Sequence, residues 1–262
     1  MKQSIIENLC SLIEEVEGNS QDPQELMNIV GNNKTYRLRV KKLDDTGPGT
    51  FRCFADLMQP GNRLPTRDRM ELAFRLSSAI LQLCKTPWID ESWAWNDVCV
   101  SQVEEDEGRI KCSIIFIPQE FYSVHHSADN ASAVDNNDTV WSILQDQPVL
   151  TKLGFALIEL ALGETLEKMK EETKNYCGLG DQHYDDDTMN LFTAKKLLKS
   201  GRIRLEATKD YEDVVKACIH HQYRDQDGTN KALLLTDDSF LLNVSEAIIS
   251  PLFHLWKKYE EI

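Results

Sequence analysis

The chain has 262 residues, of which 41% are hydrophobic and 27% are charged, a composition typical of a soluble globular protein with a substantial core. Its formal net charge of −14 repels phosphate backbones and anionic lipid headgroups, so nucleic acids and membrane surfaces are not expected as partners. No stretch approaches about eighteen consecutive apolar residues, so no membrane insertion is expected.

The first 58 residues are expected to form a helix followed by a β-hairpin. Residues 1–18 carry acidic side chains where a secretory signal would be apolar, and their apolar residues recur with helical spacing. They therefore predict an amphipathic helix in a cytoplasmic protein. Residues 35–43 alternate between polar and apolar, and a turn of glycines and proline separates them from a second predicted strand, 51–58.

The middle of the chain predicts a long helix, a strand pair and a loop. A linker containing proline and glycine leads to Thr66, which opens a helix whose apolar positions continue to Leu83. Residues 98–117 predict two strands joined by an acidic turn. The Asn-, Asp- and Ser-rich residues 122–140 predict a mobile loop.

The segment 149–164 is apolar on nearly all sides and predicts a buried central helix. Within it, Gly154 predicts the close approach of a neighbouring element, because a mid-helix glycine otherwise costs about 1 kcal/mol relative to alanine. Glu159 would need a buried partner, since an unpaired buried carboxylate is very costly. Further helices are expected at 188–200, 210–222 and 238–259, with a turn or kink in the last of them at Pro251.

The residues that most often carry chemistry are interpreted mainly as structural. The seven cysteines are at least thirteen positions apart, which indicates reduced, mostly buried thiols rather than a disulfide framework or a zinc site. Adjacent histidines on a helix diverge by about 100°, which is poor for chelating one metal. A cysteine nucleophile is left open at Cys84, Cys177 or Cys218. A weak metal site is left open at His183, Tyr184 and Asp185–Asp187. The adjacent histidines are His125–His126 and His220–His221.

Five tryptophans are partly concentrated in one region of the chain. Core filling is the favoured interpretation for these large rings. The alternative is a partner-binding anchor, because tryptophan is enriched at interface hot spots. The five are Trp88, Trp93, Trp95, Trp141 and Trp256.

The order of these segments resembles the larger, helical lobe of a protein kinase. FADLMQPGNRL resembles the hinge, RDRMELAFRLSSAILQLCKT is similar to the long helix that follows it, and LGFALIELALGE is similar to the central kinase helix. LQLCKTPWI with a following tryptophan and LGFALIELALGE also resembles an uncharacterised fungal family whose kinase-like remnant is associated with cell-death or incompatibility signalling. The resemblance covers roughly residues 35–255 and implies a kinase-like helical domain.

The resemblance also places the positions of a kinase catalytic loop. Aligned with the pattern His-Arg-Asp and a later Asn, Asp90 takes the place of the His, Glu91 of the Arg, Ser92 of the Asp and Asp97 of the Asn. A neutral Ser92 cannot serve as the catalytic base.

The segment GRIKCSIIF (108–116) resembles the kinase stretch that ends in Asp-Phe-Gly, but it has Ile114, Ile115 and Phe116 in those three places. Isoleucine offers no oxygen ligand to magnesium. The chain also lacks a glycine-rich phosphate loop and a Val-Ala-Ile-Lys strand. The resemblance therefore implies a degenerate site without catalytic, cofactor-binding or metal-binding residues.

These observations predict a mainly α, α+β protein with a kinase-like helical lobe. Residues 1–58 are expected to form a vestigial helix and β-hairpin, and residues 59–262 the helical domain, together as one folding unit. The expected function is a non-catalytic interaction and signalling module with a protein partner and no cofactor, in fungal self-recognition or immunity. The alternative is an enzyme that uses the acidic clusters with a divalent metal.

Overall fold

The computed structural model divides the chain into two compact units, Met1–Gly49 and Thr50–Ile262, where the sequence analysis placed the boundary after residue 58. The residues it describes are 24–31, 34–40, 50–59, 64–84, 89, 93–105, 109–116, 147–170, 185–225 and 227–260. The helix expected over 1–18 and the loop expected over 122–140 lie outside these residues.

The first unit contains a two-stranded antiparallel sheet. Strand β1 (Gln24–Gly31) pairs with β2 (Lys34–Val40), and the register shifts between Glu25 and Met27. A shift of this kind marks a β-bulge or irregularity in the ladder.

The predicted pairing of 35–43 with 51–58 is wrong. In the second unit, β3 (Thr50–Cys53) pairs with β4 (Cys99–Glu105), which also pairs with β5 (Arg109–Phe116), so the sheet order is β3-β4-β5. Residues Phe54–Leu57 form a helical turn, α2. Helical spacing buries both Phe54 and Leu57 on one side, which a continued strand with its alternating side chains would not do.

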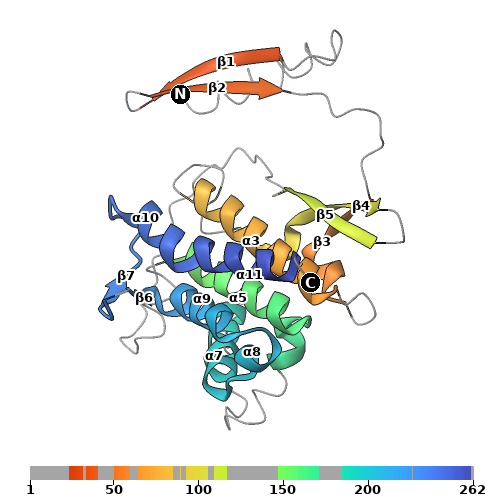
Figure 1. Cartoon of the computed structure of the whole chain (residues 1–262), viewed down its shortest axis with the longest axis vertical. Helices are drawn as coiled ribbons and strands as arrows, with labels where there is room; N and C mark the ends of the chain where they lie inside the picture. The colour runs from red at the N-terminus through yellow and green to blue at the C-terminus, as the bar shows by residue number, and fades with distance from the viewer. Residues whose placement is uncertain are drawn as a thin grey trace. The chain divides into compact units, whose positions relative to one another are not determined.

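The described part of the second unit is mainly helical, as predicted (Figure 1). Helix α3 and helix α11 run alongside each other, α5 contacts α3 on one side and α7, α8 and α9 on another, and α9 also contacts α11 (Figure 1). The helices are α3 (Thr66–Leu83), α5 (Pro148–Leu162), α7 (Asp186–Ser200), α8 (Arg202–Glu206), α9 (Lys209–His220), α10 (Phe240–Val244) and α11 (Ser250–Glu260). A short hairpin of β6 (Gln222–Arg224) and β7 (Asn230–Ala232) follows α9.

Helix α5 is the buried central helix that its composition predicts. Its residues from Val149 to Leu162 are all buried except Lys152. Gly163 ends it in the left-handed conformation with φ of 66°, and its N–H donates to the carbonyl of Glu159. Glycine adopts this conformation without the steric cost that other residues incur.

Polar side chains from the neighbouring elements bind the backbone of α5. Arg69 of α3 donates to the carbonyls of Leu160 and Ala161 at 2.9 and 2.6 Å, which satisfies acceptors in the last turn of α5. The Tyr211 hydroxyl of α9 donates to the Leu157 carbonyl at 2.8 Å. The packing around α5 is therefore fixed by directional bonds as well as by apolar contact.

Gly154 lies where α9 approaches α5 most closely. A Cβ atom at this position would lie 2.7 Å from Ile219 Cδ1 and 3.1 Å from the Cβ of Cys218. The predicted close approach is confirmed, because a larger residue at this position would require the side chains of Ile219 and Cys218 to shift.

Glu159 has the buried partners that the sequence analysis required. Its Oε2 accepts from Trp95 Nε1 at 3.1 Å and its Oε1 from the Leu166 N–H at 2.7 Å. Burial raises the pKa of Glu159 to about 7, although the bonds from Leu166 and Trp95 and the charge of Lys170 act in the opposite direction. This carboxyl group therefore titrates near neutral pH.

Pro251 shapes the last helical segment without ending it. Residues Ser245–Ile249 form a π-helical stretch, η2, between α10 and α11, and Pro251 is the second residue of α11. Proline lacks an N–H group and clashes with the carbonyl four residues earlier. The wider π-turn accommodates this clash, which is the local irregularity that the sequence predicted.

Truncating the core side of α5 should destabilise the protein far more than truncating its edge. Leu157→Ala removes a fully buried side chain, and we expect it to lower the free energy of unfolding by about 2–5 kcal/mol. We expect Lys152→Ala, at the only incompletely buried position between Val149 and Leu162, to cost under about 0.5 kcal/mol. Urea denaturation of both variants measures the difference, and equal midpoints would contradict the central position of α5.

The stability of the protein should fall as the pH rises through 7. Because the pKa of Glu159 is about 7 in the folded state and 4.5 is its ordinary value, the proton bound by the folded state stabilises it fully below about pH 4.5. This stabilisation is lost as the pH passes 7, and over the whole range the change is about 3 kcal/mol.

Urea denaturation at several pH values between 5.5 and 8.5 tests this dependence. Glu159→Gln should flatten the slope, because it removes the titrating group, whatever it does to stability at any single pH. Glu246→Gln, at an exposed position, is the matched control and should keep the wild-type slope. A wild-type slope in Glu159→Gln would show that another group titrates.

Candidate functional site

The six positions that correspond to a degenerate kinase site are placed only in part. Asp90 and Ser92 lie outside the described residues, whereas Asp97 ends the short 3-10 helix η1 (Trp95–Asp97). Residues 114–116 continue β5 to its end. Phe116 pairs with Cys99, two residues after Asp97, so the backbone brings Asp97 and the end of β5 to the same end of the sheet.

The strand geometry of residues 114–116 differs from that of a loop that would present a metal ligand. Ile115 lies opposite Val100 and Ile114 lies opposite Ser101 in the antiparallel ladder. A bulge or irregularity between Ser101 and Gln102 is accommodated within the pairing. These three residues therefore extend a sheet at the position where the resemblance would place magnesium chemistry.

Two of the tryptophans near this site fill the core, which is the interpretation that the sequence favours. Trp93 and Trp95 are both buried. The Trp95 ring meets the Phe155 ring edge-on at a centroid distance of 5.6 Å, and its N–H is the donor to Glu159. Trp95 thus ties η1 to the central helix. Trp88 and Trp141 lie outside the described residues.

The histidine and aspartate clusters have structural roles where the structure describes them. The Nε2 atom of His221 lies 2.8 Å from the Thr151 hydroxyl of α5, and His221 caps α9 in the left-handed conformation. Asp185 caps α7 and accepts from the Thr188 N–H, and Asp186 pairs with Lys170 at 3.2 Å. His125–His126, His183, Tyr184 and Cys177 lie outside the described residues.

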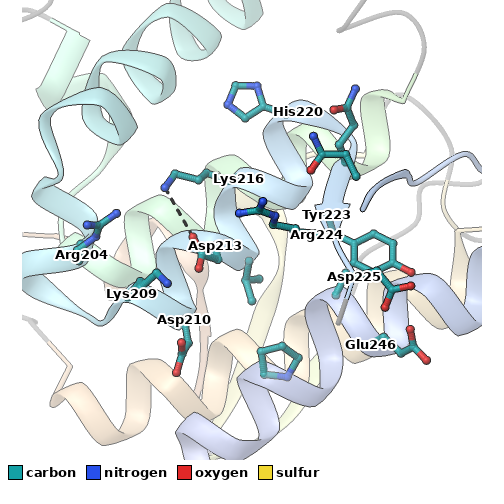
Figure 2. A pocket seen from close by; sticks show the side chains of 15 residues that line it. Arg204, Lys209, Asp210, Asp213, Lys216, His220, Tyr223, Arg224, Asp225 and Glu246 are labelled. Carbon is teal, nitrogen blue, oxygen red and sulfur yellow. Dashed lines mark ion pairs between the residues drawn. The ribbon is translucent and has the colours of Figure 1, made fainter. Parts of the chain in front are cut away.

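A polar groove of about 680 Å³ opens beside α9 (Figure 2). It is bounded by α8, α9, the β6–β7 hairpin, η2 and the start of α11. Lys209, Asp213, Lys216 and His220 recur at helical spacing along α9 and line its wall. Figure 2 shows Tyr223, Arg224, Asp225 and Glu246 at the other side of the groove.

The charges in this groove are of both signs and partly neutralise one another. Lys216 lies 3.6 Å from Asp213 and also contacts the buried Glu212, to which Arg204 donates at 2.9 Å. Burial acts to raise the pKa of Glu212, but the bonds from Lys216 and Arg204 outweigh it and lower that pKa. Such a mixed lining suits a polar segment that carries both charges better than a polyanion.

An exposed aromatic surface lies on the flank of α11 away from the groove. This aromatic ridge consists of Phe74 of α3 and Phe253 and Trp256 of α11. The rings of Phe74 and Trp256 stack at 5.2 Å with an interplanar angle of 15°, and the Phe253 ring lies 5.5 Å from Phe74 and 5.9 Å from Trp256. Phe253 keeps 38% of its surface exposed.

Cations flank the aromatic ridge. Lys257 Nζ lies 4.6 Å from the centroid of the Trp256 ring, and the guanidinium carbon of Arg75 lies 5.8 Å from it. Contacts of this kind at exposed sites contribute about 0.5–1 kcal/mol each. They also give the apolar surface a charged border.

Apolar exposure continues along the same helical segment. Leu241 and Leu242 of α10 are 56% and 62% exposed. Ile249, Phe253 and Trp256 are separated by four and three residues, a spacing that places them on one side of a helix, and Leu241 and Leu242 precede them across η2. The aromatic ridge is therefore one end of a longer apolar stripe.

The aromatic ridge and the groove were not identified from the sequence. Trp256 was noted as a possible anchor, but its partner Phe74 is far away in the chain and periodicity in α3 does not reveal their contact. The helical spacing of 209, 213, 216 and 220 is a signal from which one wall of the groove could have been found.

Two absences among the described residues concern metal binding and membrane insertion. In that part of the chain, no group of three or more His, Cys, Asp or Glu side chains is arranged to hold a metal ion. Within the same residues, none of the helices combines the length and the apolarity needed to cross a membrane.

Comparison with known proteins places the chain in a family. Neither the comparison with curated proteins nor the comparison with solved structures gave a match. The family model described as a domain of unknown function, DUF7580, matches residues 1–256, so the chain belongs to the DUF7580 family.

Proposed function

We propose that the protein is a non-catalytic interaction and signalling module that binds a protein partner through the aromatic ridge and the apolar stripe of α10–α11. The observation that carries this proposal is the cluster of the exposed Phe253 with the half-buried Trp256 and Phe74, which has Arg75 and Lys257 at its border. Tryptophan and arginine dominate the energetics of many protein interfaces.

The indole N–H of Trp256, like that of the core residue Trp93, is without a partner in the part of the chain that the structure describes. This atom is buried and has no hydrogen-bond acceptor among the described residues. A buried donor without an acceptor costs about 1–3 kcal/mol, so phenylalanine or leucine would serve the fold better at this position.

The absence of catalysis in this proposal rests on residue types. Ser92 and Ile114 offer neither the base nor the metal ligand that phosphoryl transfer needs. The continuation of Ile114–Phe116 within β5 supports the same conclusion, because a strand in a ladder does not present these positions as a metal-binding loop would.

The proposed domain is a kinase-like helical lobe. The order α3, η1, β4–β5, α5 and then α7–α11 parallels the order that supports the resemblance to a kinase helical lobe. The resemblance further implies a cytoplasmic protein of fungal self-recognition or immunity, associated with cell-death or incompatibility signalling. A partner captured from such cells would link the aromatic ridge to that setting.

Removing apolar surface from the stripe should abolish partner binding without unfolding the protein. We expect Phe253→Ser and Leu242→Ser each to reduce partner recovery about tenfold or more, because truncating an interface hot spot costs about 2 kcal/mol or more. The measurement is a quantitative pull-down from the native cell, read by mass spectrometry, with the melting temperature of each variant as the folding control.

Leu205→Ser provides the matched control for this experiment. Leu205 is 85% exposed and lies on α8, outside the aromatic ridge and the apolar stripe. It should leave partner recovery unchanged. Equal recovery with Phe253→Ser and with Leu205→Ser would contradict the proposal.

A thermal-shift panel separates this proposal from the enzyme alternative. The wild-type protein should show no shift in melting temperature with adenine or guanine nucleotides combined with Mg²⁺, Mn²⁺ or Ca²⁺. A specific ligand at about one hundred times its Kd would add about 2.7 kcal/mol of stability. A shift of that size, dependent on a divalent cation, would favour a metal-dependent enzyme.

A further inference from the structure

Two thiols that are 46 positions apart in the chain meet on adjacent strands. Cys53 ends β3 and Cys99 begins β4, and their sulphur atoms lie 3.4 Å apart. Both are reduced and half-buried. The expectation of mostly buried thiols is therefore wrong for the four cysteines whose side chains the structure describes, since three of them are half-buried.

The backbone register places this pair where a disulfide bond fits. Cys53 lies directly opposite Cys99, and in the next position the Phe54 N–H donates to the Val98 carbonyl at 2.7 Å. Hydrogen-bonded and non-hydrogen-bonded pairs alternate along an antiparallel ladder, so Cys53 and Cys99 occupy the non-hydrogen-bonded type, in which side chains approach most closely.

The two sulphur atoms need to move only a short distance to form a disulfide bond. The Cα separation in non-hydrogen-bonded pairs is about 4.5 Å, inside the range of about 4.4–6.8 Å that disulfides accept. A disulfide bond is about 2.05 Å long, so the sulphurs at 3.4 Å need to move roughly 1.4 Å closer. Side-chain rotation supplies such a movement with little displacement of either strand.

Two other described cysteines differ from this pair in their surroundings. The Cys84 thiol donates to the carbonyl of Leu81 within its own helical turn at 3.2 Å. Cys218 is fully buried, and burial raises its pKa, which suppresses the reactive thiolate. Cys84 is therefore a suitable control for the Cys53–Cys99 pair, because its thiol is also half-buried but is bonded to a backbone carbonyl.

We propose that Cys53 and Cys99 form a modification site that a low-molecular-weight disulfide oxidises to an intramolecular disulfide. The thiolate of one cysteine attacks the small disulfide, forms a mixed disulfide with it and releases one small thiolate. The second protein thiolate then attacks the protein-bound sulphur, which forms the Cys53–Cys99 bond and releases the other small thiolate.

The reaction balances without any further reactant. The two protein thiols lose two protons and two electrons, and the small disulfide takes up both to become two small thiols. A low-molecular-weight thiol reverses each step, so the site can be oxidised and reduced repeatedly.

The disulfide would fix the start of α2 to the start of β4. It would also close a loop over residues 54–98, which contains α2 and α3. Closing a loop of this length restricts the unfolded chain, so oxidation should stabilise the second unit. This inference does not depend on the aromatic ridge, because neither cysteine belongs to it.

The test uses the full chain in glutathione buffers of increasing disulfide content. After free thiols are alkylated, non-reducing peptide mapping by mass spectrometry should show a Cys53–Cys99 crosslink. The oxidised protein should melt about 5–15 °C higher than the reduced protein, and dithiothreitol should reverse the shift. Cys53→Ser and Cys99→Ser should abolish both signals, whereas Cys84→Ser should keep them.

Peptide mapping of the wild-type protein decides the proposal even if a serine variant folds poorly. A crosslink between Cys53 and Cys99 in the wild-type map supports it. A glutathione adduct that does not resolve, a crosslink to any other cysteine, or two thiols that stay reduced in the most oxidising buffer would each overturn it. Partner recovery by the aromatic ridge is measured separately, so either proposal can fail alone.

Discussion

Burial of α5 on nearly every side is the constraint on which the second unit depends. An apolar helix without a solvent-facing side requires neighbours around its whole circumference, and α3, α7, α8, α9 and η1 all contact it. Helix α9 approaches so closely that a Cβ atom at Gly154 would require the side chain of Ile219 to shift. The polar groups inside this core are matched in turn: Arg69 and Tyr211 bind α5 carbonyls, and Trp95 binds Glu159. Surfaces available for binding therefore lie on the outer sides of the helices that surround α5 and on the segment α10–α11.

The elements that could be predicted from the sequence are those set by local patterns. The helical periodicity of α3, the continuous apolar run of α5 and the pairing of the neighbouring strands β4 and β5 each lie within one stretch of chain. The partner of β3 was predicted wrongly because the partner of a strand is determined by contacts between residues far apart in the chain. Residues 35–43 and 51–58 both have strand-like patterns and are separated by a good turn sequence. β3 nevertheless pairs with β4, and the helical burial of Phe54 and Leu57 ends the strand early.

The same distinction applies to the candidate sites. The resemblance singled out positions around η1 and β5 because those residues are consecutive or nearly so. The contact of Phe74 with Trp256 and that of Cys53 with Cys99 join elements far apart in the chain, and no spacing rule predicts them. Trp256 was noticed as a residue type, but only its neighbours distinguish it from Trp93 and Trp95. Those two rings are enclosed by the core, whereas the Trp256 ring is stacked at the surface beside Lys257.

The buried core also connects to the thiol pair through a short path in the chain. Trp95 is held by Glu159 and packs against Phe155 of α5, and η1 is followed by Val98, which is fully buried and accepts from the Phe54 N–H. Cys99 comes next. Its position opposite Cys53 is therefore continuous in the chain with the packing of η1 against α5. Glu159, at the start of this path, therefore links α5 through Trp95 to the strand that begins with Cys99.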